Sequence, residues 1–406
     1  MHRLTFVCLF LVFTCGLTAQ SAPEVEGDLL SSGTLEYRNV VSGNYRLTDN
    51  GEAKKNTYTL TLMDNDLQPI GSKVYRNDKP LRFEDIAFNG SNLALLILEG
   101  DEKDNRRFID IVDGSGELVR REFLIDGSGS TGHFLHPQAD GFVSCVSWGE
   151  APKRPYPRRR FELRKTSTQE EAGDDWRSTF TSKKEGNSLY PRFLTGNEEN
   201  LALFVRRGKN LKSGPQYQDV FTVDLTTGKT VYRQKETIKD DPNVAQRIVT
   251  GKFVGEELIL VRFRSRRRKI DRAWLSLERL DATGKEVVKE KYAVDGELRK
   301  LINGPETLAE DSLRGNVQLA PSRMRLNEKG EFVIGFEAYK LSYPQFEFRD
   351  AYLLAFGADF APVAATKVPK TWFKLSPNHL EEINGYQTRV IRKKMLKGET
   401  ERFTMT

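Results

Sequence analysis

Short apolar runs recur along the chain, and a turn-forming segment precedes each of them. The runs are rich in Leu, Val, Ile and Phe, and they occupy residues 92–98, 141–147, 200–206, 257–263 and 331–337. The preceding turns are rich in Asn, Asp and Gly, as in Asn89-Gly90-Ser91. Runs of this composition between turn residues are typical of β-strands. The pattern therefore predicts a strand, a turn and a second strand at each of these places.

A second hairpin follows the first in most units. Its turn begins with Asp and contains Gly, at residues 113–117, 224–229 and 281–285, with a looser version at 64–68. Gly suits such turns because it accepts the positive φ that a tight hairpin requires. The repeating unit is thus four strands joined by two turns and a loop, with a spacing of roughly 50 to 75 residues.

These repeats predict the fold class. The first unit spans residues 35–75 and the last begins near Leu380, which makes about seven units. We expect an all-β protein, a β-propeller of about seven four-stranded blades, in a single domain over residues 20–406. Six blades, an unclosed ring and a truncated C-terminus are the alternatives. In a closed ring, residues 20–30 or 35–41 could complete the last blade and remove an exposed sheet edge.

The N-terminus predicts export. Arg3 precedes the apolar stretch 4–17, and Ala19 and Ala22 offer cleavage sites, which is the pattern of a secretory signal peptide. A transmembrane anchor needs about twenty apolar residues, and this stretch is shorter. We predict a signal peptide over residues 1–19 and a protein located in the periplasm or outside the cell.

Cysteine and charge add two constraints. Cys8 and Cys15 lie in the signal peptide, and lipoprotein processing at Cys15 is disfavoured by the bulky Phe13 before it. Cys145 is then the single mature cysteine, so no intramolecular disulfide is expected.

The formal charge of +6 comes from a chain that is dense in charges of both signs, which favours solubility and indicates no particular anionic partner. No later apolar run reaches membrane-spanning length, and we expect a soluble mature protein.

Few motifs suggest catalysis. The sequence contains no Gly-x-Ser-x-Gly elbow, phosphate-binding loop, dinucleotide fingerprint or His-Glu-x-x-His motif. His133 and His136 are a close pair, but the Gly-rich residues before them and Pro137 after them argue against a helical metal site. Residues 113–116 and 126–129 resemble fragments of a calcium loop, and hairpin turns explain them without an ion. We expect no metal and no cofactor.

Three basic clusters, at residues 153–160, 262–269 and 392–397, raise the possibility of a polyanionic partner. Tyr156 and Phe161 could stack on nucleic acid bases beside the first cluster. Export separates the protein from nucleic acid, however, and charge runs usually face water. We interpret the clusters as solvated loops and expect no nucleic acid partner; a polyanionic glycan or lipopolysaccharide stays an alternative.

Five residues are candidates for ligand binding: three lie near the start or end of a predicted strand, where propellers build the rim of a central channel, and two are the His pair of an inner strand or loop. Exposed aromatic and Arg side chains are common in binding sites, and each could equally pack in the core. The candidates are Trp148, Tyr190, Arg192, His133 and His136.

The first hundred residues carry a resemblance to a known group. Residues 43–48, 58–73 and 83–89 are similar to a family of exported proteins from Bacteroidota that has no assigned function. The resemblance implies a β-rich repeat protein, and it transfers no catalytic residue.

Together these features favour a non-catalytic binding or scaffolding propeller with a glycan or protein ligand. The alternative is an enzyme, a glycan-active hydrolase or lyase that uses carboxylates, Tyr and Arg in the central channel. Propeller folds host both classes, so the fold alone does not decide between them.

Overall fold

The computed structural model describes most of the chain between residues 27 and 375. The described residues are 27–51, 56–100, 105–126, 130–149, 159–169, 175–182, 188–208, 217–237, 244–266, 269–293, 298, 317–327, 330–342, 345–368 and 373–375. The predicted signal peptide and the predicted unit near Leu380 lie outside these residues.

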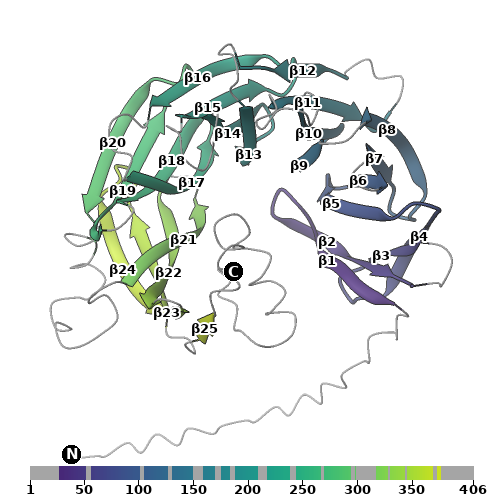
Figure 1. The fold of residues 1–406 in the computed structure, drawn as a ribbon, viewed down its shortest axis with the longest axis horizontal. Helices are drawn as coiled ribbons and strands as arrows, with labels where there is room; N and C mark the ends of the chain where they lie inside the picture. The colour runs from purple at the N-terminus through teal and green to yellow at the C-terminus, as the bar shows by residue number, and fades with distance from the viewer. Residues whose placement is uncertain are drawn as a thin grey trace, which may run out of the picture.

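In this part of the chain the fold is all-β, and consecutive strands form six antiparallel sheets (Figure 1). The strands of the first three sheets are β1 (Asp28–Tyr37), β2 (Val40–Asp49), β3 (Asn56–Met63), β4 (Pro69–Asn77); β5 (Leu81–Phe88), β6 (Leu93–Gly100), β7 (Asn105–Val112), β8 (Leu118–Asp126); and β9 (Thr131–Gln138), β10 (Gly141–Gly149), β11 (Arg159–Ser167), β12 (Arg177–Phe180). Those of the last three are β13 (Ser188–Gly196), β14 (Asn200–Gly208), β15 (Tyr217–Asp224), β16 (Thr230–Thr237); β17 (Val244–Val254), β18 (Glu257–Arg266), β19 (Lys269–Leu280), β20 (Glu286–Ala293); and β21 (Val317–Leu326), β22 (Phe332–Ser342), β23 (Gln345–Phe356), β24 (Pro362–Val368), with β25 (Phe373–Leu375) paired to β23.

The four-stranded unit predicted from the sequence is confirmed in all six sheets, since each sheet takes its strands in chain order. The first sheet corrects one detail. Residues 35–41 do not form a strand that could complete a distant sheet, because they hold the end of β1, the turn at Arg38 and Asn39, and the start of β2. The reason is the pairing of β1 with β2, which occupies this segment within its own hairpin.

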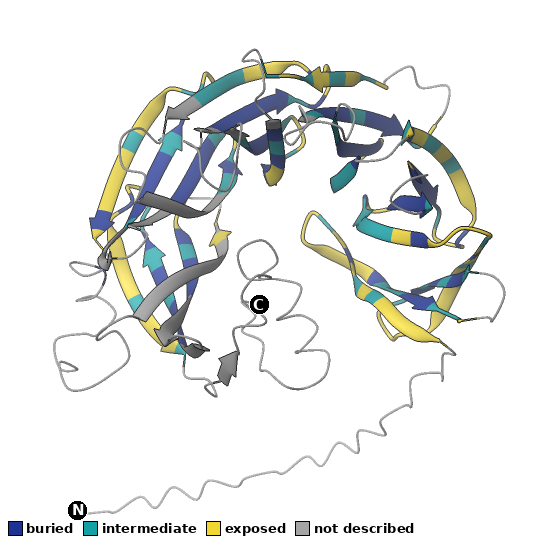
Figure 2. Ribbon diagram, viewed as in Figure 1, coloured by how far each residue is buried: buried dark blue, intermediate teal, exposed yellow. Residues whose placement is uncertain are grey.

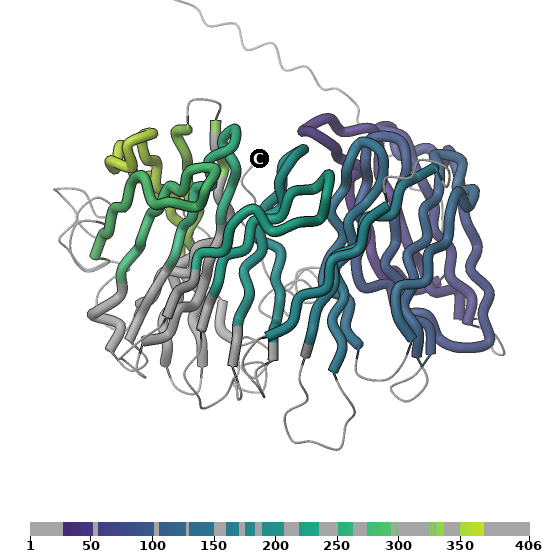
Figure 3. The backbone as a smooth tube through the Cα atoms, turned by 90° about the horizontal axis from the view of Figure 1, so that it is seen from above, coloured from purple at the N-terminus to yellow at the C-terminus, as the bar shows by residue number. Residues whose placement is uncertain are grey.

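The six sheets follow one another around an arc, with the first strand of each sheet on the inner side (Figure 1). Inner strands contact the next inner strand, from β1 to β5, β9, β13, β17 and β21. Seen at right angles, the strands of successive sheets run alongside one another (Figure 3). Among the described residues no comparable contact joins the first sheet to the last. The structure therefore establishes a series of stacked sheets in a propeller-like arrangement, in which the described residues do not close a ring.

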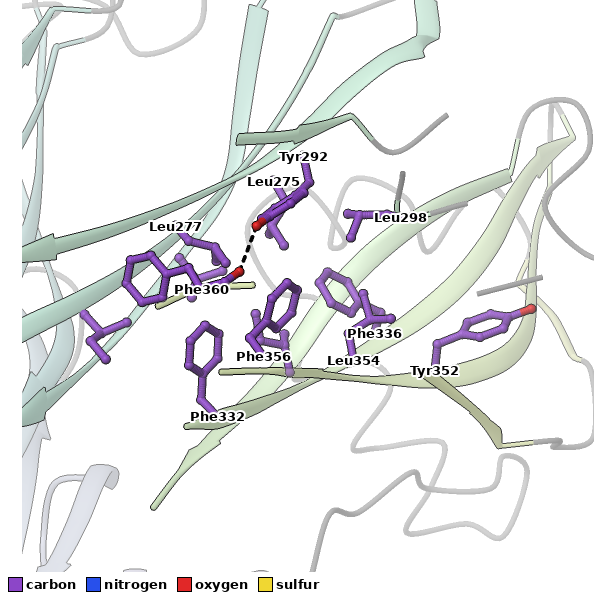
Figure 4. Close-up of a cluster of buried hydrophobic side chains, with 13 residues drawn as sticks. Leu275, Leu277, Tyr292, Leu298, Phe332, Phe336, Tyr352, Leu354, Phe356 and Phe360 are labelled. Atoms are coloured by element: carbon purple, nitrogen blue, oxygen red, sulfur yellow. Dashed lines mark hydrogen bonds between the residues drawn. The ribbon is translucent and has the colours of Figure 1, made fainter. Parts of the chain in front are cut away.

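The hydrophobic core lies between the sheets. One apolar cluster fills each of the five interfaces, and the middle strands of the sheets are the most buried (Figure 2). In the interface between the fifth and sixth sheets, the rings of Phe332 and Phe356 stack with centroids 5.1 Å apart (Figure 4). Beside them the Tyr292 hydroxyl donates a hydrogen bond to the carbonyl oxygen of Phe360 at 2.8 Å. Burial of these faces supplies the main stabilisation of the sheet stack.

Hairpin turns also join neighbouring sheets. In the turn between β7 and β8, the Asp113 carboxylate accepts hydrogen bonds from the backbone N–H groups of Ser115 and Glu117. The Ser115 carbonyl then accepts a hydrogen bond from the N–H of Ser72 in the first sheet, at 3.2 Å. Asp113 is therefore engaged in the turn itself, which supports the interpretation of residues 113–116 as a turn.

Five sheets carry an acidic side chain on the third strand that pairs with a basic side chain on the fourth. In an otherwise apolar strand, such a carboxylate is tolerated when it is paired and hydrogen-bonded. The pairs are Asp110–Arg121, Glu162–Arg177, Asp219–Arg233, Glu278–Lys289 and Asp350–Lys367. The first sheet differs, because β3 contains no acidic residue.

Two further observations concern membrane-spanning helices and the cysteine. No helix in the described part of the chain has the length and the apolar character needed to cross a bilayer. Cys145 is a free thiol on β10, and it is buried between the third and fourth sheets.

Candidate active site

A β-bulge in the inner strand of the second sheet brings two consecutive carboxylates to the same neighbour. Phe83 pairs with Ile97 and Asp85 with Leu96, so Glu84 is the additional residue of the bulge. In a regular strand, neighbouring side chains point to opposite faces. Here both reach β9: Glu84 accepts the N–H of Gly132 at 3.1 Å, and Asp85 accepts the N–H of Leu135 at 2.6 Å. The two carboxylates thereby join the second sheet to the third.

Glu84 is neutralised by arginine. The buried guanidinium of Arg107 donates to its carboxylate from Nε at 2.7 Å and from a terminal nitrogen at 2.9 Å, and Arg82 adds a bond at 2.8 Å. Burial would raise the pKa of Glu84, but the hydrogen bonds and charges of Arg107 and Arg82 hold it below its ordinary value. Glu84 is therefore a paired structural carboxylate.

Asp85 is in a different environment. Burial raises the pKa of its carboxyl to about 6, although the N–H groups of Leu135 and Ile86 oppose the shift by favouring the ionised form. The side chain therefore exchanges protons near neutral pH. Adjacent carboxyls whose pKa values are driven apart by their surroundings are a common arrangement of acid and base in enzymes.

Asp85 lines a cavity of about 270 Å³ on the inner side of the arc. We call it the inner cavity. Its walls come from four sheets: Thr34, Glu36 and Tyr45 from the first; Asp85, Ile86, Ala87, Phe88 and Leu93 from the second; Leu135, His136 and Pro137 from the third; and Phe193 from the fourth. The cavity thus combines aromatic and aliphatic surface with a few polar groups, as small-molecule sites usually do.

His136 forms part of the far wall. Burial lowers the pKa of its imidazole to about 4, although the carbonyl of Asn197, 3.4 Å from Nε2, opposes the shift. The ring stacks on Phe193 with centroids 5.7 Å apart, and it lies so close to Gly196 that a Cβ there would be 2.4 Å from its Cε1. His136 is therefore a neutral, tightly packed ring at neutral pH.

The other residues predicted for ligand binding lie elsewhere. His133 shares a hydrogen bond with the Ser147 hydroxyl at 2.7 Å. Trp148 packs against the apolar cluster between the second and third sheets. Tyr190 lies on β13, opposite Arg206 of β14, and Arg192 is exposed on the same strand. Of the five predicted residues, the structure places His136 alone in the inner cavity.

Asp85, Glu36, Tyr45 and Phe193 are not among the binding residues predicted from the sequence. One signal was available, because Glu84 and Asp85 are two consecutive acids inside the apolar strand 81–88. Glu36 and Tyr45 carried no such signal, since their place in the cavity depends on how the first sheet packs against the second.

Among the described residues there is no group of three His, Cys, Asp or Glu side chains that could hold an ion. His133 and His136 make separate contacts, one with Ser147 and the other with the carbonyl of Asn197. Close spacing in a strand therefore does not make them a ligand pair.

One basic residue corrects the interpretation of its cluster as a solvated loop. Arg262 is buried on β18, and its guanidinium donates to Glu278 at 3.0 Å and to Gln234 of the preceding sheet at 2.9 Å. The positive charge of Arg262 is therefore balanced inside the protein by the buried carboxylate of Glu278, and it does not face solvent. The side chains of Lys153, Arg154 and Arg158, and those of residues 392–397, lie outside the described part of the structure.

No protein-family model matches the sequence, and no curated protein matches it. Solved structures resemble it weakly. The lignostilbene dioxygenase of Pseudomonas brassicacearum is 8% identical, with a TM-score of 0.38 over 59% of this chain and 58% of that one. A mutant of the apocarotenoid oxygenase of Synechocystis is 10% identical, with a TM-score of 0.38 over 82% and 72% of the two chains. A cobalt-substituted form of the same oxygenase gives 10% identity and a TM-score of 0.38 over 78% and 70%.

These neighbours are enzymes, and they contradict the expectation of a non-catalytic binding or scaffolding propeller. We do not retain that interpretation. The chain spans less than two thirds of the length of the dioxygenase. At TM-scores of this size the likeness assigns no reaction, substrate or metal to this chain.

Proposed function

We propose that the protein is a glycan-active hydrolase whose active site is the inner cavity. The observation that carries the proposal is Asp85, a carboxyl that burial brings to a pKa of about 6 inside a cavity that also presents the carboxylate of Glu36. Enzymes that cleave glycosidic bonds use a pair of carboxyl groups, one of them with a raised pKa.

The roles follow from the two environments. Asp85, which burial keeps protonated up to a pH of about 6, donates its proton to the leaving oxygen as the bond from that oxygen to the anomeric carbon breaks. A water molecule forms the new bond to the anomeric carbon and transfers a proton to the exposed carboxylate of Glu36. Both carboxyl groups then return to their starting states by proton exchange with solvent. Glu84 takes no part, because Arg107 and Arg82 already occupy its oxygens.

The cavity wall supports a sugar as the substrate class. A sugar ring has polar edges and apolar faces, and the cavity sets Phe193, Phe88 and Pro137 against Thr34 and the two carboxyl groups. Phe193 keeps 40% of its surface exposed, so its ring is accessible to a ligand. Exposed aromatic rings contribute strongly to ligand binding sites.

The test is release of new reducing ends from a panel of oligosaccharides. Asp85→Asn should lower kcat about a hundredfold or more, and Glu36→Gln should lower it at least about tenfold, because each removes one proton transfer. Asp66→Asn and Glu117→Gln, which change exposed turn residues, serve as matched controls and should be unaffected. Wild-type activity should fall as the pH rises above about 6, the pKa of Asp85. Full activity in Asp85→Asn, cleavage of no oligosaccharide, or unsaturated products would overturn the proposal.

We also propose that the six sheets are blades of a β-propeller that a seventh unit near residues 380–393 completes. The regular packing of each inner strand on the next supports this proposal, and so does the strand-turn-strand pattern of residues 380–393. Export of the protein and its membership of the Bacteroidota family remain proposals that rest on the N-terminal sequence. A mature N-terminus at Gln20, measured by mass spectrometry, would support export; a retained Met1 would contradict it.

A further inference from the structure

The hairpin of β1 and β2 extends beyond the rest of the first sheet. Its pairing shifts by one residue after Leu35, which pairs with Gly43 whereas Glu36 pairs with Val41. The third strand pairs with β2 only from Asn44 onward. Residues 36–43 therefore form a two-stranded projection, which we call the hairpin tip.

Gly43 sets the direction of this projection. It has a φ of +156°, and a Cβ there would lie 2.2 Å from the carbonyl oxygen of Met63. The register shift after Leu35 adds a bulge at the base of the hairpin tip, and bulges commonly bend a strand. Val40 and Val41 are exposed at the tip, whereas the Tyr37 ring lies against Gly90 of the second sheet, where a Cβ would be 3.1 Å from its Cδ1.

An ion pair joins the hairpin tip to the fourth sheet. Arg38 donates from Nε to one oxygen of the Glu198 carboxylate at 2.7 Å, and a terminal nitrogen bonds the other oxygen. Glu198 lies in the turn between β13 and β14, 160 residues further along the chain. Both side chains are more than half exposed, at 57% and 54%. The pair is therefore well oriented but easily separated by water and salt.

The ion pair connects two segments that lie next to residues of the cavity wall. Glu36 at the base of the tip and Tyr45 of β2 line one side of the cavity. Phe193, five residues before Glu198, lines the opposite side. The hairpin tip thus begins at Glu36 in the cavity wall, and its ion pair is with Glu198, in the turn that follows the strand of Phe193. Figure 1 shows the tip directed toward the interior of the arc.

We propose that the hairpin tip is a strap that controls entry to the inner cavity, with Arg38 and Glu198 as its latch. Closed, the strap keeps bulk water and large molecules away from Asp85. Opening separates the ion pair and swings the tip about the bulge at Ser42 and Gly43. Because an exposed ion pair contributes little, its loss changes the population of the open state only about two- to fivefold. Because the strap affects only access to the cavity, its test is independent of the proposed glycosidase activity.

The test uses Ala87→Cys in the cavity wall and a fluorescent maleimide about as large as a disaccharide. Labelling at position 87, followed by peptide mass spectrometry, is compared in four backgrounds: the intact latch, Arg38→Glu, Glu198→Arg and both reversals together. Each single reversal should speed labelling about two- to fivefold. The double reversal should restore the slow rate, because it rebuilds the ion pair. The buried Cys145 provides an internal control, since burial raises the pKa of its thiol and slows its reaction.

A disulfide between positions 38 and 198 should hold the strap closed. Arg38→Cys with Glu198→Cys, oxidised, should slow labelling at position 87, and a reductant should restore it. Hydrogen exchange of the backbone amides in residues 36–43 provides a second readout that needs no cysteine in the cavity. Exchange should be faster in each single reversal and slow again in the double one. Equal labelling and exchange rates in all four backgrounds would overturn the strap, as would a double reversal that stays fast.

Discussion

Asp110 and Arg121 face each other on neighbouring strands, and the fully buried carboxylate of Asp110 accepts two hydrogen bonds from the guanidinium, at 2.6 and 2.7 Å. The guanidinium also lies over the ring of Phe108, 4.4 Å from its centroid. Equivalent acid–base pairs occur on the third and fourth strands of four more sheets. We infer that these pairs hold the fourth strand in its register in the five sheets that contain them.

Variants of Asp110 and Arg121 should differ in their free energy of unfolding in a specific order. Asp110→Asn should lower the free energy of unfolding by about 2–3 kcal/mol, because a charged hydrogen-bond acceptor is lost inside the core. Replacing both partners, with Asp110→Leu and Arg121→Leu, should recover much of that loss, since no unpaired charge remains. Urea unfolding of the three variants measures both effects. A double variant that is less stable than the single one would show that the pair contributes more than its own desolvation costs.

Gly116 and Gly114 provide a matched test of contact between sheets. Gly116 has a φ of +87°, and a Cβ there would lie 2.5 Å from the carbonyl oxygen of Ser72 in the first sheet. Gly116→Ala should therefore cost about 2 kcal/mol of stability through backbone strain and a steric clash. Gly114, in the same turn, has nothing within 4 Å of its would-be Cβ, and Gly114→Ala should change stability by less than about 0.5 kcal/mol. Thermal unfolding measures both, and equal effects would contradict the docking role of this turn.

Asp85 and His136 predict opposite trends of stability with pH. The pKa of His136 falls from 6.5 to about 4 on folding, so its contribution is present at high pH and is lost as the pH falls from 6.5 toward 4. The pKa of Asp85 rises from 3.8 to about 6, so its contribution is present at low pH and is lost as the pH rises from 3.8 toward 6. In the wild type the two trends oppose each other.

Single variants separate the two contributions. In Asp85→Asn the free energy of unfolding should rise more steeply with pH between 4 and 6 than in the wild type, because His136 is left unopposed. In His136→Gln it should rise less steeply. Thr34→Ala, which removes a cavity side chain that does not titrate, should leave the slope unchanged. Denaturant unfolding across this pH range measures the slopes, and identical slopes in Asp85→Asn and His136→Gln would refute the assignment.

The strands and hairpins were predictable from the sequence because their determinants are local. At Asp281 and Gly284, for example, the carboxylate bonds the N–H groups of Thr283 and Lys285, and Gly284 adopts a φ of +80°. Every one of these interactions spans at most four residues. A pattern of Asp, Thr and Gly between two alternating runs therefore carries the information for the turn.

The candidate site was not predictable in the same way. The sequence shows Glu84 beside Asp85, but it does not show that a bulge turns both side chains toward β9. It also does not show that Arg107 neutralises Glu84, whereas none of the described residues that line the cavity beside Asp85 is an arginine or a lysine. Likewise, the sequence shows His136 only as one of a histidine pair, whereas its position in the cavity depends on Phe193 and the turn at Asn197. The pKa of a carboxyl depends on its burial and its neighbours, and both come from segments distant in the sequence.

By itself, the sequence determined the all-β class, the four-stranded unit and the positions of most turns, since alternating apolar residues and Asp–Gly turns act over a few residues. The tertiary structure decided which carboxyl has a raised pKa, where the inner cavity lies and which hairpin bonds to a distant sheet. The distinction has a physical reason. Backbone turns form through neighbours in the chain, whereas burial, charge pairing and the Arg38–Glu198 contact form only when separate sheets pack together.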